Sequence, residues 1–544
     1  MPASTSTPAA DAAAVTSAAS DDPAAGAAAP PGRTRAEPAP LAGMGLAITS
    51  IALALGTFMQ VLDSSIANVS IPTIAGDLGV SADQGTWVIT SFAVANGISV
   101  PLTGWLMGRF GVVKTFVGSV LLFTVASFLC GVSWNLPSLI GFRILQGAVS
   151  GPMIPGSQAL LISIFPPNRR GGALAIWSMT TLVAPVIGPV LGGYISDNYS
   201  WPWIFLINVP VGVLCAFLCW TNLRSRETPA HKMKVDTVGF GLLVVWVGAL
   251  QVMLDTGKDA DWFSSPAIVV LACVSAVSFA AWIIWELTEA NPIVDLSLFK
   301  SRNFAIGASV TCLGYGVFFG NNVLLPLWLQ TRLGYVATWA GLVAAPSGVV
   351  AVLLTPIAAR IMTRVDARWT ASLALVAFAT SFWMRSLYPP DASFGVLVMP
   401  MLVQGVAMSV FFVSLITLTL NGVPPEQLPK ATGLSNFTRI TAGSFAASIT
   451  TTLWDRGAAV GRTRITETTG PWNPDWQAAM NGLHRAGLDS AHALGVLSQQ
   501  IESQAYLVST LDYFRASAWI ILIALPGVWL TSRAVGGGGG AAGD

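Results

Sequence analysis

Fourteen apolar segments constrain the fold of this chain more than any other feature of its sequence. They run over about 45–67, 84–107, 112–132, 136–164, 171–195, 202–223, 237–255, 266–287, 304–330, 338–362, 370–388, 393–420, 432–454 and 512–533. A helix needs roughly 20 mostly apolar residues to cross a bilayer, and these segments are of that length. Charged residues make up only 10% of the chain, against about 25% in a soluble domain. The sequence therefore predicts an all-α polytopic membrane protein with 14 transmembrane helices.

Lysine and arginine are unevenly distributed among the links between these segments. The links after the first, third and fifth segments contain none, whereas those after the second, fourth and sixth carry Arg109, Lys114, Arg169, Arg170, Arg224, Arg226, Lys232 and Lys234. Because cytoplasmic loops are enriched in these residues, both termini are expected in the cytoplasm, with Arg332 as an exception on the outer side. Residues 1–43 and 536–544 read as flexible tails. The long outer loop at about 455–511 is either a solvated cap or a docking surface for a partner.

Several functional classes find no support in the sequence. A net charge of +1 gives no indication of nucleic-acid binding, and no Gly-Lys-Ser/Thr phosphate loop points to ATP. The five cysteines lie in apolar runs and the three histidines in loops, which predicts neither a disulfide nor a metal site. No catalytic residues are expected, and the chain is not predicted to be an enzyme.

One carboxylate lies within the first apolar segment. At helical spacing Gln60, Asp63, Ser64, Ala67 and Asn68 share one face. A charged residue near the centre of a bilayer costs roughly 2.5–3.5 kcal/mol, so such a stripe is expected to face a cavity rather than lipid. We therefore predict that Asp63 takes up and releases a proton, with Gln60 and Asn68 beside it. The alternative is that Asp63 lies near the membrane surface and only orients the helix.

The fourth segment carries a cation. Arg143, Gln146, Gly147, Ser150 and Gly151 share a face. A guanidinium stays charged at any relevant pH, so Arg143 is expected to keep a nearby carboxylate ionised until substrate or movement separates them. A purely structural cation, bonded to backbone carbonyls, is the alternative.

Two glycine-rich stretches are candidates for conformational roles. The link between the second and third segments contains Gly104, Gly108, Arg109, Gly111 and Lys114, and the fifth segment contains Pro185, Gly188, Pro189, Gly192 and Gly193. Glycine allows tight turns and close helix contact, and proline interrupts a helix. The simpler interpretations are a positively charged anchor for the first stretch and a packing face for the second.

The second half of the chain offers weaker candidates for a substrate cavity. Phe318, Asn321 and Asn322 combine an aromatic ring with amides, Gln404 lies in the twelfth segment, and Arg439 lies in the thirteenth. These groups suit stacking and adaptable hydrogen bonds to a drug-like ligand. Alternatively, the amides bond between helices and Arg439 extends to the membrane surface.

Several of these stretches together resemble one transporter family. They are 62–69 (LDSSIANV), 104–114 (GWLMGRFGVVK), 184–193 (APVIGPVLGG), 434–439 (LSNFTR) and 442–446 (AGSFA). The chain resembles the fourteen-helix drug:proton antiporter branch of the major facilitator superfamily, and within it the inner-membrane pumps of the EmrAB–TolC type. Many members carry an acidic residue where Gly108 stands here.

The resemblance implies an architecture and a function. It implies two six-helix bundles, at 44–225 and 300–535, with two linker helices at 226–299 between them, and alternating access around a central cavity. It implies export of small hydrophobic drugs in exchange for H+, driven by the proton-motive force without a cofactor, in contact with membrane lipid. It also implies the cell inner membrane of a Gram-negative organism, a periplasmic adaptor of EmrA type and a TolC-type outer-membrane channel.

Three other functions remain open at this point. The chain could export one dedicated metabolite or siderophore, or serve as a membrane scaffold or sensor without transport. An uptake symporter is a further alternative, against which the motif at 184–193 argues.

Overall fold

The computed structural model describes residues 41, 43–166, 170–230, 235–290, 292–362, 364–424, 427–468 and 472–534. Both predicted tails, except for residues 41 and 43, lie outside this set, as do Arg169, Lys232, Lys234 and the side chain of Pro185. Within the described residues the regular structure is helical. The helices are α1 (Gly43–Leu78), α2 (Ala82–Gly85), α3 (Trp87–Ser99), α4 (Thr103–Phe110), α5 (Val112–Gly131), α6 (Leu136–Ser150), α7 (Met153–Ile164), α8 (Arg170–Asn198), α9 (Trp203–Leu206), α10 (Asn208–Leu223), α11 (Thr237–Thr256), α12 (Pro266–Thr288), α13 (Arg302–Thr331), α14 (Ala337–Met362), α15 (Ala367–Arg385), α16 (Phe394–Leu420), α17 (Leu428–Thr468), α18 (Pro474–Arg485) and α19 (Ser490–Trp529).

Each of the predicted apolar segments falls on one of these helices or on a short run of them. By length and composition, 10 helices within the described residues can cross a membrane. The predicted segments at 136–164, 171–195, 370–388 and 432–454 are not among those 10, so the count of fourteen spans stays a prediction.

Local sequence explains where several helices begin and break. Asn135 starts α6 with a capping box, in which its side chain accepts from the Ser138 N–H. The second segment divides at a short 3-10 turn, Val100–Leu102, that contains Pro101. The fourth divides before Pro152, since proline has no N–H to continue a helix.

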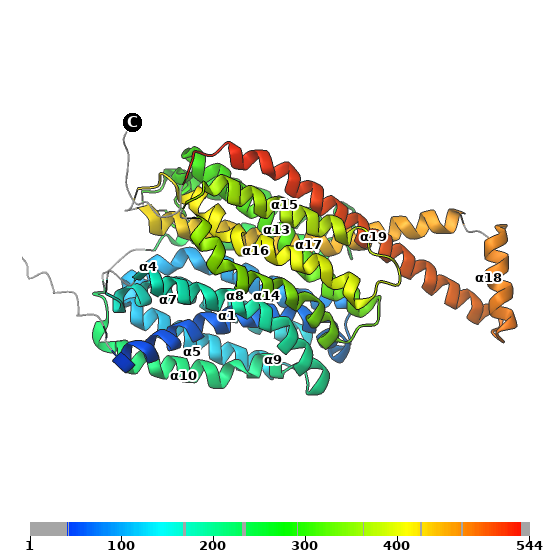
Figure 1. The fold of residues 1–544 in the computed structure, drawn as a ribbon, viewed down its shortest axis with the longest axis horizontal. Helices are drawn as coiled ribbons and strands as arrows, with labels where there is room; N and C mark the ends of the chain where they lie inside the picture. The colour runs from blue at the N-terminus through cyan, green and yellow to red at the C-terminus, as the bar shows by residue number, and fades with distance from the viewer. Residues whose placement is uncertain are drawn as a thin grey trace, which may run out of the picture. The chain divides into compact units, whose positions relative to one another are not determined.

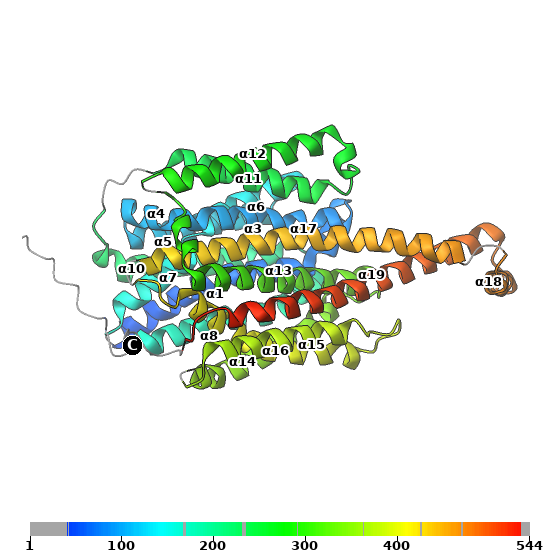
Figure 2. The same cartoon turned by 90° about the horizontal axis from the view of Figure 1, so that it is seen from above.

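The long helices pack in two sets. In the first set α1 packs on α8 and α10, and α6 packs on α3 and α5; in the second set α13 packs on α17 and α19, and α16 packs on α14 and α15. The sets meet where α14 lies on α8 and where α17 lies on α3. Helices α11 and α12 pack on each other along one side, with α11 against α3 and α17 (Figure 2).

The predicted outer loop at 455–511 is largely helical. Helix α17 continues to Thr468 and α19 begins at Ser490, with α18 between them, so these three helices project beyond the other helices as a hairpin (Figure 1). Small side chains allow the two long helices to stay in contact, as where Gly461 lies against Ala505. The apolar pattern ends near residue 454 but the helix does not, because its packing on α19 stabilises a stretch that contains two glycines and three threonines.

Candidate functional site

Asp63 lies buried at the centre of a polar cluster in the first set of helices. The carboxylate of Asp63 on α1 accepts from Arg143 Nη1 of α6 at 2.5 Å, and both side chains are fully buried. The other carboxylate oxygen accepts from Gln146 Nε2 at 3.1 Å and from Asn208 Nδ2 of α10 at 2.8 Å. Three helices thus converge on one carboxylate.

Arg143 is held from several sides. Its Nε donates to the carbonyl of Val88 at 2.8 Å, and its Nη1 also donates to Gln146 Oε1 at 2.7 Å. The guanidinium lies over the rings of Phe92, at 4.2 Å, and Phe205, at 5.4 Å. Both interpretations of Arg143 from the sequence, carboxylate partner and backbone-bonded cation, therefore describe contacts it makes.

Glycines bring the neighbouring helices close to this cluster. A Cβ on Gly147 of α6 would meet the backbone of Phe92, so only glycine permits α6 to approach α3 there. On α8, a Cβ on Gly188 would meet Ser65, and one on Gly192 would meet the carbonyl of Ile66. The motif at 184–193 therefore seats α8 on α1 beside Asp63.

The same motif also reaches the second set of helices. A Cβ on Gly193 would meet the Ala337 carbonyl of α14, and one on Gly341 of α14 would meet the carbonyl of Pro189. Helix α8 therefore contacts both α14 and α1. If α8 slides or rocks against α14, its contact with α1 is displaced as well. This arrangement connects the contact between the two sets with the surroundings of Asp63.

Gln60 and Asn68 extend the polar stripe of α1 on either side of Asp63. Within the described residues, Gln60 Oε1 and Asn68 Oδ1 are buried and have no hydrogen-bond partner. Buried polar atoms are nearly always paired in native proteins. An unpaired oxygen at such a position is therefore a candidate acceptor for water or a ligand.

The candidates of the second half do not gather around one point. Asn321 donates to Ser517 Oγ of α19 at 3.1 Å, which is the interhelical amide bond given as the alternative. Gln404 accepts from the guanidinium of Arg385. Asn322 is half-buried.

Arg439 and Phe318 belong instead to an aromatic group on α13 and α16. The Arg439 guanidinium lies 4.7 Å from the ring centroid of Tyr315 and 5.6 Å from that of Phe412. Phe318 is 6.1 Å from Tyr315 and 6.4 Å from Phe412. A cation over aromatic faces suits flat or amphiphilic ligands.

Arg385 is a fully buried guanidinium that the sequence analysis did not single out. Within the described residues it forms no ion pair, and it bonds Gln404, Ser381 and Met401 on α15 and α16. Gln404 follows Gln146, and Asn321 follows Asp63, by the same interval along the chain. The two halves thus carry polar residues at matching intervals, but Asn321 bonds Ser517 rather than Arg385 or Gln404, so the second half does not repeat the first cluster as one contact group.

The glycine-rich link at 104–114 is bound by a carboxylate from another part of the chain, Glu227. Glu227 accepts from the N–H groups of Val113 and Lys114, at 3.0 and 2.8 Å, at the start of α5. Gly111 has a φ of 93°, a conformation that favours glycine, and a Cβ there would run into Glu227. Arg109 and the Lys114 side chain are exposed. Gly108 is half-buried, and Gly104 is open to its surroundings.

Replacing Glu227 by alanine is expected to destabilise the protein by about 1 kcal/mol, because the first N–H groups of α5 lose their acceptor. Glu227→Gln keeps one acceptor oxygen and is expected to lose less. Arg109→Ala, at an exposed position in the same link, serves as the control. Unfolding midpoints of the detergent-solubilised variants measure this, and equal midpoints for Glu227→Ala and Arg109→Ala would contradict it.

A second charged group joins three parts of the chain near the hairpin. Lys258, which follows α11, bonds Asp83 of α2 and, at 2.8 Å, Asp455 of α17. Burial lowers the pKa of Lys258, but the carboxylates of Asp455 and Asp83 outweigh it and raise that pKa above the usual value, so the ammonium stays charged.

Lys258→Met is expected to lower the free energy of unfolding by about 1–3 kcal/mol, since two partly buried carboxylates would be left without their cation. Lys300→Met removes an exposed lysine and is expected to have little effect. Thermal unfolding of the two variants decides the matter, and identical midpoints would show that Lys258 contributes nothing.

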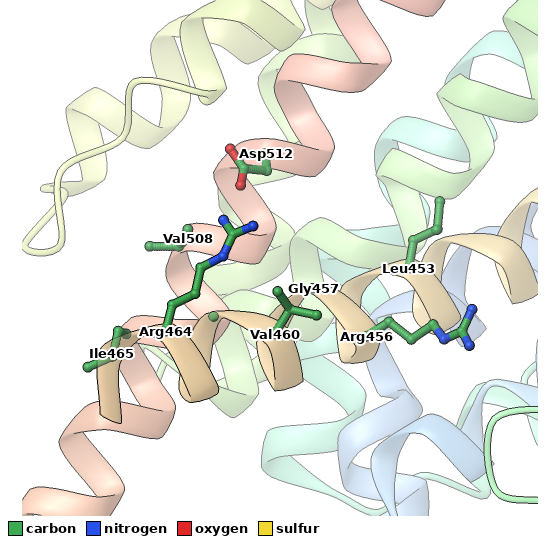
Figure 3. A pocket seen from close by; sticks show the side chains of 9 residues that line it. Leu453, Arg456, Gly457, Val460, Arg464, Ile465, Val508 and Asp512 are labelled. Atoms are coloured by element: carbon green, nitrogen blue, oxygen red, sulfur yellow. The ribbon is translucent and has the colours of Figure 1, made fainter. Parts of the chain in front are cut away.

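A groove of about 410 Å³ lies on the hairpin, away from the Asp63 cluster. Its apolar part is formed by Leu453, Val460 and Val508, and Arg456 and Arg464 flank it. Figure 3 shows Arg464 of α17 extending toward Asp512 of α19. None of the candidate residues from the sequence lines this groove.

The parts of the chain that the structure describes contain no group of three or more His, Cys, Asp or Glu residues able to hold a metal ion.

Comparisons with known proteins place these features in a family. The model of the Major Facilitator Superfamily matches residues 53–448. The chain is 51% identical over 505 residues to the multidrug export protein EmrB of Escherichia coli (strain K12), covering 93% of this chain and 99% of that protein. It is 44% identical over 501 residues to the fatty acid resistance protein FarB of Neisseria gonorrhoeae, covering 92% and 99%. A solved bacterial homolog of the human lysosomal transporter Spinster, in an inward-facing and occupied conformation, shares the fold with a TM-score of 0.59 at 15% identity, covering 90% of this chain and 97% of that one.

Proposed function

The chain belongs to the major facilitator superfamily, and on that premise we propose that it exports hydrophobic and amphiphilic compounds in exchange for protons. It is a multi-pass membrane protein and a secondary transporter rather than an enzyme. The observation that carries the proposal is the buried pair of Asp63 and Arg143, joined at 2.5 Å between α1 and α6. The driving force is the proton-motive force, without a cofactor.

The pair couples proton binding to movement. With Asp63 ionised, its charge and that of Arg143 hold α1 and α6 together at a site where both side chains are buried. A proton on Asp63 removes the negative charge, and the guanidinium then keeps only Gln146, the Val88 carbonyl and the rings around it. Arg143 and α6 become free to shift, and release of the proton on the other side of the membrane restores the pair.

Substrate binding rests on apolar and aromatic surfaces with few polar contacts. The group around Tyr315, Phe318, Phe412 and Arg439 offers stacking and one cation. Such a surface favours breadth over selectivity, and it accommodates anionic amphiphiles. The names of the relatives, which cite multidrug export and fatty acid resistance, are consistent with that range.

We further place the protein in the inner membrane of a Gram-negative cell, with both termini in the cytoplasm. The resemblance to pumps of the EmrAB–TolC type adds a periplasmic adaptor of EmrA type and a TolC-type outer-membrane channel. The hairpin of α17, α18 and α19 projects on the side where such an adaptor would stand, and it carries exposed Trp472. A solvated cap remains the alternative for this hairpin.

Shortening the hairpin provides a test of adaptor docking. Replacing residues 462–500 with a short Gly-Ser linker is expected to abolish capture of a purified EmrA-type adaptor, because the projecting surface is gone while α17 and α19 remain within the membrane. Membrane insertion and the unfolding midpoint serve as controls. Unchanged adaptor capture by a well-folded variant would assign the hairpin to the solvated cap instead.

Proton movement in sealed inverted vesicles tests the transport proposal itself. A lipophilic drug added to an established pH gradient is expected to trigger proton release from vesicles that contain the protein, and not from empty vesicles. A panel of unrelated drugs separates the alternatives. Release with one compound only would favour an exporter dedicated to one metabolite or siderophore, and no release with any compound would favour a scaffold or sensor.

A further inference from the structure

A second buried carboxylate lies on α11, outside both sets of helices and apart from the Asp63 cluster. Asp255 is 7% exposed, and its Oδ2 accepts from the hydroxyl of Thr90 on α3 at 3.0 Å and from Gln251 Nε2 at 2.9 Å. Gln251 in turn donates to Ser448 Oγ of α17 at 2.6 Å and accepts from Ser444 Oγ at 3.1 Å. One network of hydrogen bonds therefore joins α3, α11 and α17.

The partners of Asp255 differ in kind from those of Asp63. Asp63 is bound to a guanidinium, whereas the hydrogen bonds that Asp255 accepts come from a hydroxyl and an amide, and in the described part of the chain it forms no ion pair. Neutral donors fit both an ionised carboxylate and a protonated carboxyl, which can itself donate to a hydroxyl. The charge of Asp255 is thus not fixed by its contacts.

The charged groups around Asp255 leave that choice open. Lys258, three residues further along the chain and just beyond the end of α11, is the cation near Asp255, but its ammonium is bound to Asp83 and Asp455. Asp83 comes from α2, which precedes the helix that carries Thr90, and Asp455 comes from α17, which also carries Ser448. Helix α3 contains no titratable side chain and contributes the Thr90 hydroxyl, and Glu286 of α12 lies at the opposite end of α11, beside Gly239.

The hydrogen-bond network around Asp255 lies where the two sets of helices meet, so a proton bound by Asp255 would affect that contact. Thr90 lies in the first set of helices and Ser444 and Ser448 in the second, so the network crosses a contact that must change when the two sets rock. Ser444 Oγ also lies 3.2 Å from the Thr90 carbonyl, which makes the contact direct as well as bridged. A change at Asp255 alters what holds α3 to α17.

We propose that Asp255 is a second proton-binding residue of the transport cycle, and that the inserted helix α11 carries it to the contact between the two sets of helices. The proton comes from water and returns to water, and the carboxylate of Asp255 binds it in between. This inference deepens the proposed function, and its claim about the transport cycle rests on that function. Proton binding at Asp255 can be measured without any substrate.

Infrared difference spectroscopy of the reconstituted full chain during a pH jump tests the binding step. The wild type is expected to show a band of a protonated buried carboxyl that Asp255→Asn lacks and Asp255→Glu shifts. Asp259→Asn removes an exposed carboxyl four residues further on and should leave the band in place. A band that survives unchanged in well-folded Asp255→Asn would overturn the proposal, as would the absence of any such band in the wild type.

Drug-triggered proton release in weakly buffered detergent solution tests the coupling. Asp255→Asn is expected to release about one proton fewer per chain than the wild type, and Asp259→Asn the same number as the wild type. An equal count in Asp255→Asn would exclude Asp255 from the cycle. Release from none of the proteins would count against the proposed function, and the infrared result would then still decide whether Asp255 binds a proton.

Discussion

Asp63→Asn is expected to abolish drug accumulation driven by a pH gradient in inverted vesicles. Asparagine matches aspartate in shape and still offers one oxygen to Arg143, so the helices around it keep most of their contacts. It cannot, however, take up and release a proton, and the change that frees Arg143 no longer occurs. Drug binding at constant pH is expected to remain, since Asp63 is buried behind Arg143, Gln146 and Asn208.

Two variants control this experiment. Asp77→Asn removes an exposed carboxyl from the same helix and should leave accumulation at the wild-type level. Asp63→Glu retains a titrating group and is expected to retain part of the activity. Accumulation by Asp63→Asn equal to that of the wild type, at equal protein content, would show that another residue couples the proton to the drug.

The sequence was sufficient to predict a helical membrane protein with many apolar spans and to single out Asp63 and Arg143. Helix-forming apolar segments are visible because the bilayer sets their length, and a carboxylate inside one of them is conspicuous. Arg143 was found by the same reasoning, and the structure brings it to Asp63 from 80 residues away. The glycines at 188 and 192 were expected to permit close packing, and the structure adds that their partner is α1.

The partners that sequence reasoning missed are neutral or distant. Asn208 donates to Asp63 from the first residue of α10, inside the predicted apolar segment 202–223, where a single neutral amide is less conspicuous than a charge. Glu227 lies beyond α10 in a polar link, so nothing in the sequence assigns it to the start of α5. Arg385 stands at the end of its segment, where positively charged residues usually reach the surface, yet it is buried.

Hydropathy also says nothing of helices outside the membrane. The hairpin consists of polar helical turns that are continuous with α17 and α19, and a hydropathy pattern records only where their apolar faces end.

Asp255 was missed for a related reason. It lies in the last turn of its helix, where a carboxylate is ordinary, and only tertiary contacts with α3 and α17 show that it is buried.

Arg143→Met is expected to lower the free energy of unfolding by about 3–5 kcal/mol, which is the cost of leaving a buried charge without its partner. The carboxylate of Asp63 would keep the amides of Gln146 and Asn208 but lose the guanidinium. The double variant Asp63→Asn/Arg143→Met is expected to recover more than half of that loss, because it removes the unpaired charge. Denaturant unfolding of the four proteins of this cycle measures the coupling between the two residues.

Arg109→Met removes an exposed arginine and is expected to change stability by less than about 0.5 kcal/mol. A double variant that loses the sum of the two single losses would contradict the coupling.

The cycle also separates the two interpretations of Arg143, because a structural cation and a coupling residue predict different behaviour in transport. If Arg143 served only to stabilise the helices, recovery of stability in the double variant would bring back drug accumulation. Coupling through the pair requires that stability recovers and proton-driven accumulation does not, since neither a proton acceptor nor the charge that responds to it is left.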